Sequence, residues 1–134
     1  GNQHGSDNNR SCVLKVTAAN LSLLLPGDIE RDSENQLLAR YGGLLDTDIL
    51  VVPHHGSRTS STTSFVQAVN PVYALFPVGY RNRWGFPKQD VLERYLDQGS
   101  IILRSDQHGA ILFRENGDFV TWRQNAAGLW TANY

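Results

Sequence analysis

Two adjacent histidines, His54 and His55, are the residues of this sequence best suited to chemistry. They follow the apolar run Asp48 to Val52 and stand between Pro53 and Gly56. An imidazole nitrogen can ligate a metal ion or exchange a proton near neutral pH. If the segment is extended, adjacent side chains point to opposite sides, so only one histidine would face a given metal ion while the other orients a ligand or meets substrate. A pair of loop histidines bonded only to the backbone explains the pattern equally well.

A second candidate is Asp28, which follows the apolar run Leu21 to Pro26 and is preceded by Gly27. A carboxylate at the end of a strand, beside a glycine that lets the backbone approach closely, suits a metal ligand or a general base. Asp is also common in turns, and on this pattern alone a turn is the simpler interpretation. The same interpretation applies to Asp106 and His108, which lie between two expected strands.

The segment 79–88 concentrates arginine and aromatic side chains. Arginine pairs with phosphate and stacks on bases, and aromatic rings stack on unpaired bases. We therefore expect nucleic acid to be bound by Arg81, Asn82, Arg83 and Trp84. In the alternative, the rings of Trp84 and Phe86 pack inward and the arginines are solvated.

Strands and helices are expected to alternate along the chain. Strands are predicted at 11–17, 21–25, 48–52, 72–78, 101–104, 110–114 and 119–122. Helices are predicted at 33–41 with Ser33 as N-cap, from a cap at Ser60 or Ser61 to Asn70, and at 88–98 with Val91, Leu92, Tyr95 and Leu96 inward. Asn116-Gly117 predicts a hairpin turn. The pattern is typical of an α/β layered domain with a mixed sheet, and each polar segment named above follows a strand, where such sheets gather ligand-binding loops.

Composition limits the class of protein. A chain of 134 residues with 40% apolar and 19% charged residues is a folded domain with a real core, and it has no apolar run of the roughly 18 residues that cross a bilayer. With a net charge of −1, any phosphate contact must come from a local cluster. Cys12, the single cysteine, excludes an internal disulfide and is expected to be buried in the first strand. The polar residues 1–10 indicate disorder or a boundary inside a larger protein.

Four segments together resemble the soluble metallo-β-lactamase-like domain of the ComEC family of DNA-uptake channel proteins. They are "LLLPGDIE", "DILVVPHHGSRTSS", "VNPVYALFPVGYRNRWGFP" and "SIILRSDQHGAI", and the resemblance extends from about residue 11 to residue 113. It implies a partial metallo-β-lactamase fold, one half of an αββα sandwich, with a mixed sheet and flanking helices. Residues 1–134 would then be a single domain fragment, the C-terminal half of such a domain.

The resemblance also implies site roles. By position, Asp28 matches a carboxylate that bridges two metal ions, and the pair His54–His55 contains a later histidine ligand, without indicating which of the two it is. The ions, zinc or manganese, activate a water and polarise a phosphoryl or acyl group. The family's His-x-His-x-Asp-His motif is absent, and Asp28 with one histidine cannot hold a catalytic metal tightly. We therefore expect this chain alone to bind no metal tightly and to be inactive, or nearly so.

The function implied by the resemblance is that of a metal-dependent phosphodiesterase, a nuclease acting on the DNA strand that is not imported. Its partners would be single-stranded DNA and the transmembrane channel part of the same polypeptide, on the outer face of a bacterial cytoplasmic membrane. Two alternatives remain open. One is a non-catalytic DNA-binding or gating module, and the other is a metallo-hydrolase of small esters or lactams, because a fold does not determine a substrate.

Overall fold

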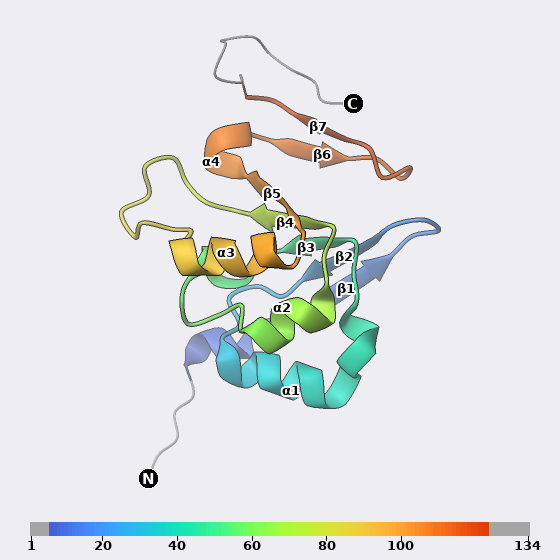
Figure 1. Cartoon of the computed structure of the whole chain (residues 1–134), viewed down its shortest axis with the longest axis vertical. Coiled ribbons are helices and arrows are strands. Elements are labelled where there is room, and N and C mark those ends of the chain that lie inside the picture. Colours follow the sequence, from blue (N-terminus) through green and yellow to red (C-terminus); the bar gives the residue numbers. More distant parts are fainter. Residues whose placement is uncertain (1–5, 124–134) are drawn as a thin grey trace.

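A five-stranded mixed sheet forms the centre of the computed structural model, which describes residues 6–123 (Figure 1). Its strands lie side by side in chain order: β1 (Leu14–Thr17), β2 (Ser22–Leu25), β3 (Ile49–Val51), β4 (Tyr73–Phe76) and β5 (Ile101–Arg104). The pair β1–β2 is antiparallel, and the neighbours from β2 to β5 are parallel. The expected α/β class and mixed sheet are confirmed.

The helices and a small hairpin surround this sheet. The three main helices are α1 (Arg31–Tyr41), α2 (Thr63–Val69) and α3 (Gln89–Asp97), and single turns occupy Asp7–Arg10, Gly42–Leu45, Pro53–Gly56 and α4 (Ser105–His108). A second sheet is the hairpin of β6 (Ile111–Phe113) and β7 (Phe119–Thr121), seen above the main sheet in Figure 1. Its turn contains Gly117 at φ 89°, which confirms the Asn-Gly prediction. No helix within residues 6–123 is long and apolar enough to cross a membrane.

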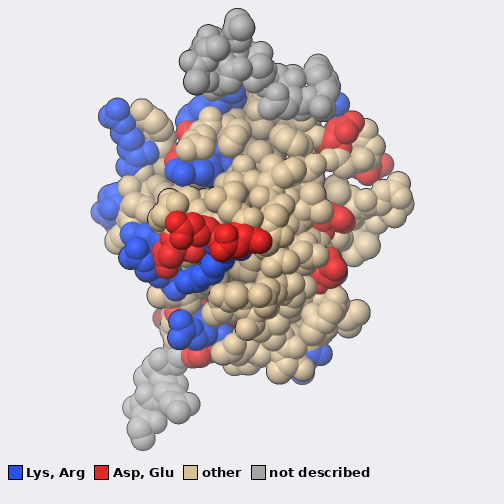
Figure 2. Space-filling model, in the orientation of Figure 1, with Lys and Arg blue, Asp and Glu red and all other residues tan. Residues whose placement is uncertain are grey.

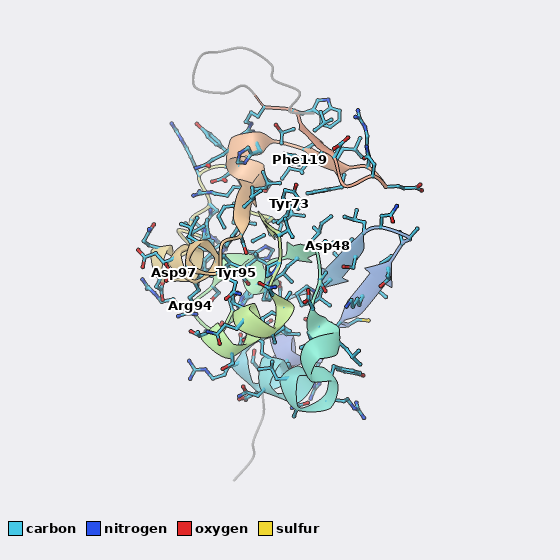
Figure 3. All side chains as sticks on the ribbon, turned by 45° about the vertical axis from the view of Figure 1, so that its right-hand side comes forward. Asp48, Tyr73, Arg94, Tyr95, Asp97 and Phe119 are labelled. Carbon is cyan, nitrogen blue, oxygen red and sulfur yellow. The ribbon has the colours of Figure 1, made fainter. Side chains whose placement is uncertain are left out.

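The core lies between the sheet and the three main helices. Alternate strand residues face it, and α2 and α3 supply the apolar side chains on the other side; the buried members include Leu24, Leu50, Ala74, Phe65, Val66, Val69, Val91 and Tyr95. Tyr95 is fully buried, and its hydroxyl bonds to Ser61 Oγ at 2.8 Å (Figure 3 labels Tyr95). Burying these side chains is the main stabilising contribution.

The sheet face turned away from the helices is also apolar, and it is only partly covered. On this face the ring of Tyr73 packs against Phe113 and Phe119 of the hairpin, with ring centroids 5.1 and 5.4 Å apart (Figure 3). At the edge strand β1, by contrast, Leu14 is 52% exposed and Val16 is 45% exposed. The hairpin therefore covers one end of this face and leaves the other open.

Two predicted helix starts are wrong. Helix α1 begins at Arg31 with Glu30 as N-cap, and Ser33 lies inside its first turn, where its hydroxyl donates to the carbonyl of Asn9. Helix α2 begins at Thr63 because Thr62, rather than either of the two preceding serines, caps it and accepts the Phe65 N–H. In both places the nearby serine hydroxyl is used in a contact between segments.

Two burial predictions are also wrong. Cys12 is exposed, because it precedes the first paired residue of an edge strand. Leu96 is 55% exposed. The inward face of α3 is formed by Val91 and Tyr95, which lie one turn apart, and Leu96 is rotated away from that stripe.

Candidate metal site and adjoining basic loop

The histidine turn, Pro53–Gly56, follows β3 and is compact rather than extended. His54 (φ 49°, ψ 39°) and His55 (φ 56°, ψ 19°) both have left-handed backbone conformations. The expectation of an extended pair is therefore wrong. Each such conformation costs about 1–2 kcal/mol for a residue with a Cβ, so tertiary contacts must hold the turn. One of them is the hydrogen bond from His54 N–H to the carbonyl of Gly27, at 3.1 Å, which joins the turn to the segment that carries Asp28.

The turn brings His55 to Asp28. The distance from His55 Nε2 to Asp28 Oδ1 is 3.6 Å, and both side chains are 45% exposed. On the other side of the ring, Nδ1 lies 2.8 Å from the carbonyl oxygen of Pro77, which can only accept. In the neutral imidazole the proton is therefore on Nδ1, and the Nε2 lone pair faces the carboxylate side. This backbone-carbonyl arrangement is the one that orients histidine ligands of metal ions.

The spacing of these two atoms fits a shared metal ion. At ligand distances of about 2.0–2.2 Å and a tetrahedral angle, two ligand atoms lie about 3.4 Å apart. The observed 3.6 Å requires only a small adjustment. Asp28 and His55 thus have the chemistry and the separation of two ligands of one metal ion.

His54 belongs to a different set of contacts. Its Nδ1 lies 3.2 Å from Thr59 Oγ1 and 3.6 Å from Glu30 Oε1, and its side chain is 21% exposed. Glu30 is in turn bonded by the Asn8 amide at 2.9 Å. Of the two histidines, His55 is therefore the one whose ring lies beside Asp28, and His54 lies beside Glu30. Glu30 was missed by the sequence analysis, although its position two residues after Asp28 was an available signal.

Further ligands are not assembled by the part of the chain that the structure describes. No group of three or more His, Cys, Asp or Glu side chains within residues 6–123 is arranged to hold a metal ion. Asp106 pairs with Arg104 at 2.7 Å, and the hydrogen bond from that guanidinium lowers the Asp106 pKa. His108 Nδ1 accepts the Arg104 N–H at 3.0 Å. Both side chains therefore bond to Arg104 within the turn, which agrees with the turn interpretation of the sequence.

A buried carboxylate braces the segment that follows the histidine turn. Glu34 of α1 accepts the N–H groups of Ser61 and Thr62, at 2.5 and 2.9 Å, and burial raises its pKa. Arg94 of α3 donates to the Ser61 carbonyl at 2.8 Å (Figure 3 labels Arg94). Ser60 Oγ donates to the carbonyl of Ile29 at 2.7 Å, so this segment is also tied to the residue after Asp28.

The basic loop, residues 77–88, is seated on the histidine turn at both ends. At its start, the Pro77 carbonyl bonds to His55. At its end, the Phe86 ring lies 6.1 Å from the ring of His54 and 6.5 Å from that of His55, and the Lys88 N–H donates to the Gly56 carbonyl at 3.0 Å. The candidate ligand and the loop are therefore one packed unit.

The tip of this loop points outward. Tyr80 is 67% exposed and Trp84 is 59% exposed, while Phe86 packs against the core. Arg81 and Arg83 are exposed, and Figure 2 shows Lys and Arg side chains gathered on the side where Figure 1 draws this loop. Asn82 differs from these neighbours, because its amide bonds within the loop. Of the inward-packing alternative, the parts concerning Phe86 and the solvated arginines match the structure, whereas the Trp84 ring does not pack inward.

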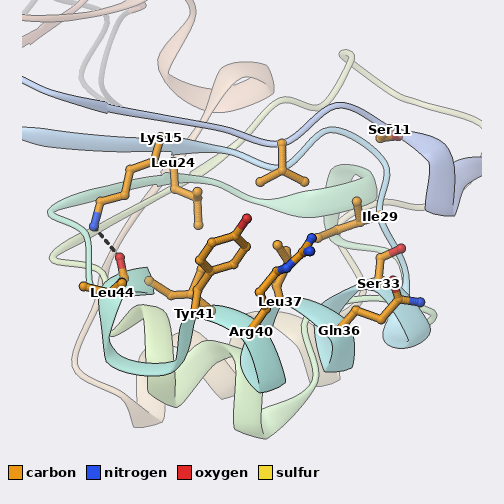
Figure 4. A pocket seen from close by; sticks show the side chains of 12 residues that line it. Ser11, Lys15, Leu24, Ile29, Ser33, Gln36, Leu37, Arg40, Tyr41 and Leu44 are labelled. Atoms are coloured by element: carbon orange, nitrogen blue, oxygen red, sulfur yellow. Dashed lines mark hydrogen bonds between the residues drawn. The ribbon is translucent and has the colours of Figure 1, made fainter.

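A separate cavity of about 470 Å³ lies between β1 and α1 (Figure 4). Apolar side chains such as Leu24, Ile29 and Leu37 line it, and Lys15 closes one side by donating to the Leu44 carbonyl at 2.7 Å. None of the sequence-predicted site residues lines this cavity.

No protein-family model matches the sequence. The chain is 43% identical over 107 residues to competence protein ComA of Neisseria gonorrhoeae, 35% identical over 109 residues to ComE operon protein 3 of Bacillus subtilis, and 42% identical over 89 residues to recombination protein 2 of Haemophilus influenzae. These matches cover 80%, 81% and 66% of the chain, but only 16%, 14% and 11% of the relatives. The chain is therefore a homologue of a segment of competence proteins, including ComE operon protein 3.

Proposed function

We propose that this chain is part of a ComEC-type DNA-uptake protein and carries one side of the metal site of a metallo-β-lactamase-like phosphodiesterase. The substrate would be the DNA strand that is not imported. The competence relatives support the DNA-uptake role. The observation that carries the catalytic part is the Asp28–His55 pair, with the His55 ring oriented by the Pro77 carbonyl.

The fold supports the same proposal. A half-sandwich must leave one apolar sheet face available for the second sheet, since two packed sheets share a core about 10 Å thick. The face opposite the helices has this character, with Leu14, Val16 and Ile101 between 45% and 52% exposed. We propose that the remainder of an αββα sandwich covers it and supplies the other metal ligands.

The roles of the residues follow from their contacts. A bound zinc or manganese ion would supply an activated water and charge stabilisation at a phosphoryl group. Asp28 and His55 would hold it, and Pro77 would keep the His55 lone pair directed to it. His54 stays outside the pair, where Glu30 and Thr59 hold its ring. The attachment to a transmembrane channel and the outer-face location belong to this proposal.

The test uses the longer protein in which this segment is preceded by the rest of the proposed domain. We expect manganese- or zinc-dependent cleavage of single-stranded DNA, abolished by Asp28→Asn and retained by the control Asp32→Asn, an exposed acid in the first turn of α1. The 134-residue chain should be inactive. A longer protein without bound metal and without cleavage would refute the proposal.

A second candidate, a DNA-binding or gating module without catalysis, is favoured by the exposed arginines and by the presence of only two candidate ligands within residues 6–123. It predicts DNA binding by the longer protein, with neither metal nor cleavage. The assay of metal-dependent DNA cleavage by the longer protein therefore distinguishes the two candidate functions.

A further inference from the structure

We propose that Tyr80, Arg81, Arg83, Trp84 and Arg123 form a platform for single-stranded nucleic acid, on which unpaired bases stack and phosphates pair. The platform deepens the proposed function, because it names the form of DNA presented to the Asp28–His55 pair. The role of the platform in cleavage rests on the proposed function, but its binding of single strands does not, since binding itself needs no metal.

The first half of the platform is built by two elements far apart in sequence. The guanidinium carbon of Arg81 lies 5.2 Å from the centroid of the Tyr80 ring, and that of Arg123, two residues after β7, lies 5.7 Å from it. Arg123 is held there by donating to the carbonyl of Asp106. An exposed ring beside two cations offers a base one stacking surface and two phosphate contacts.

The second half repeats this arrangement within the loop. The guanidinium carbon of Arg83 lies 4.5 Å from the Trp84 ring centroid. Within residues 6–123, no carboxylate forms an ion pair with Arg81, Arg83 or Arg123, whereas Arg58 and Arg104 are each paired with an aspartate. The three platform arginines are therefore not neutralised by described acidic side chains and can meet phosphate.

Hydrogen bonds within the loop hold the platform together without a ligand. The Asn82 side chain donates to the carbonyl of Phe86 at 2.7 Å and accepts its N–H at 2.8 Å, which closes the loop. Lys88 Nζ donates to the Trp84 carbonyl at 2.7 Å. Little ordering is then required on binding, which favours affinity.

The position of the platform selects the substrate form. The loop starts and ends on the histidine turn, so the platform at its tip belongs to the same packed unit as His55. Bases in a duplex are already stacked on each other and cannot cover Tyr80 and Trp84. Single strands should therefore bind more tightly than duplexes.

The test is fluorescence anisotropy of a labelled oligodeoxythymidylate, and of a duplex of equal length, titrated with the 134-residue chain in EDTA at several KCl concentrations. We expect the single strand to bind more tightly. Tyr80→Ala and Trp84→Ala should each weaken it by about 5- to 150-fold, and Trp84→Phe should restore most of the loss. Three phosphate contacts give a slope of log K against log salt of about −2, and Arg81→Ala or Arg123→Ala should reduce it by about 0.7.

Tyr41→Ala and Arg40→Ala are the matched controls, because both residues are exposed on α1, away from the loop. The platform is overturned if Trp84→Ala and Arg81→Ala bind like these controls, or if duplex binds as tightly as single strand. Asp28→Asn should bind normally. Binding without cleavage in the longer protein would refute the phosphodiesterase activity but not the platform. Cleavage that is insensitive to Trp84→Ala and Arg81→Ala would refute the platform but not the phosphodiesterase activity.

Discussion

Gly56→Ala is expected to separate the histidine turn from the basic loop. Gly56 has φ 82°, and an added Cβ would lie 2.7 Å from Pro87 Cβ and 2.9 Å from Phe76 Cε1. The left-handed conformation costs about 1–2 kcal/mol once a Cβ is present. Overpacking against the two buried rings of Phe76 and Pro87 costs about 1–3 kcal/mol more. The free energy of unfolding should therefore fall by about 2–5 kcal/mol.

Urea denaturation followed by circular dichroism measures this change, and Gly99→Ala is the matched control. Gly99 has φ 86°, but its added Cβ meets no atom within 4 Å. The control should lose only about 1–2 kcal/mol, the cost of the backbone conformation. If Gly56→Ala is no less stable than Gly99→Ala, the close packing of the turn against the loop is refuted.

Three further predictions concern individual hydrogen-bonding side chains. Hydrogen bonds from Ser22 lower the Asp48 pKa. The contribution of Asp48 to stability is therefore present above the ordinary aspartate pKa and is lost as pH falls through the lowered pKa. Asp48→Asn should be about 1–2 kcal/mol less stable in urea at pH 7, and equal stability would contradict this. Burial raises the Glu34 pKa. The contribution of Glu34 to the free energy of unfolding is therefore greatest below the ordinary glutamate pKa and declines as pH rises through the raised pKa. The free energy of unfolding should depend less on pH in Glu34→Gln, and an unchanged dependence would refute the raised pKa. Asn82→Ala should speed hydrogen exchange at the Phe86 amide and weaken single-strand binding, whereas Asn82→Asp keeps the acceptor and should protect that amide.

The elements of this fold were predictable because their signals are local. The apolar runs of the strands, the Asn116-Gly117 turn and the Asn70 stop each involve only a short stretch of chain, and the structure has strands, a turn and a helix end at these places. Helix starts were less predictable. Ser33 is a good N-cap by residue type, but it bonds to Asn9, and that partner is visible only in the folded chain.

The sequence suggested the residues of the candidate site but not their arrangement. Placing Asp28 and a histidine at the ends of neighbouring strands followed from the α/β pattern. The left-handed histidine turn did not, because two consecutive residues with positive φ have no local signature and depend on contacts with Gly27 and Pro77. Arg123 is a similar case, since its position near Tyr80 comes from the docking of a distant hairpin.

We propose that His55, and not His54, is paired with Asp28 as a metal ligand. The most direct measurement is the manganese and zinc affinity of the longer protein carrying His55→Gln or His54→Gln, each with its thermal stability as a control. His55→Gln should lower affinity by more than the roughly 10- to 100-fold loss typical of removing an outer partner, while His54→Gln should stay within that range. Loss of metal in His54→Gln, with normal affinity in His55→Gln, would contradict the assignment.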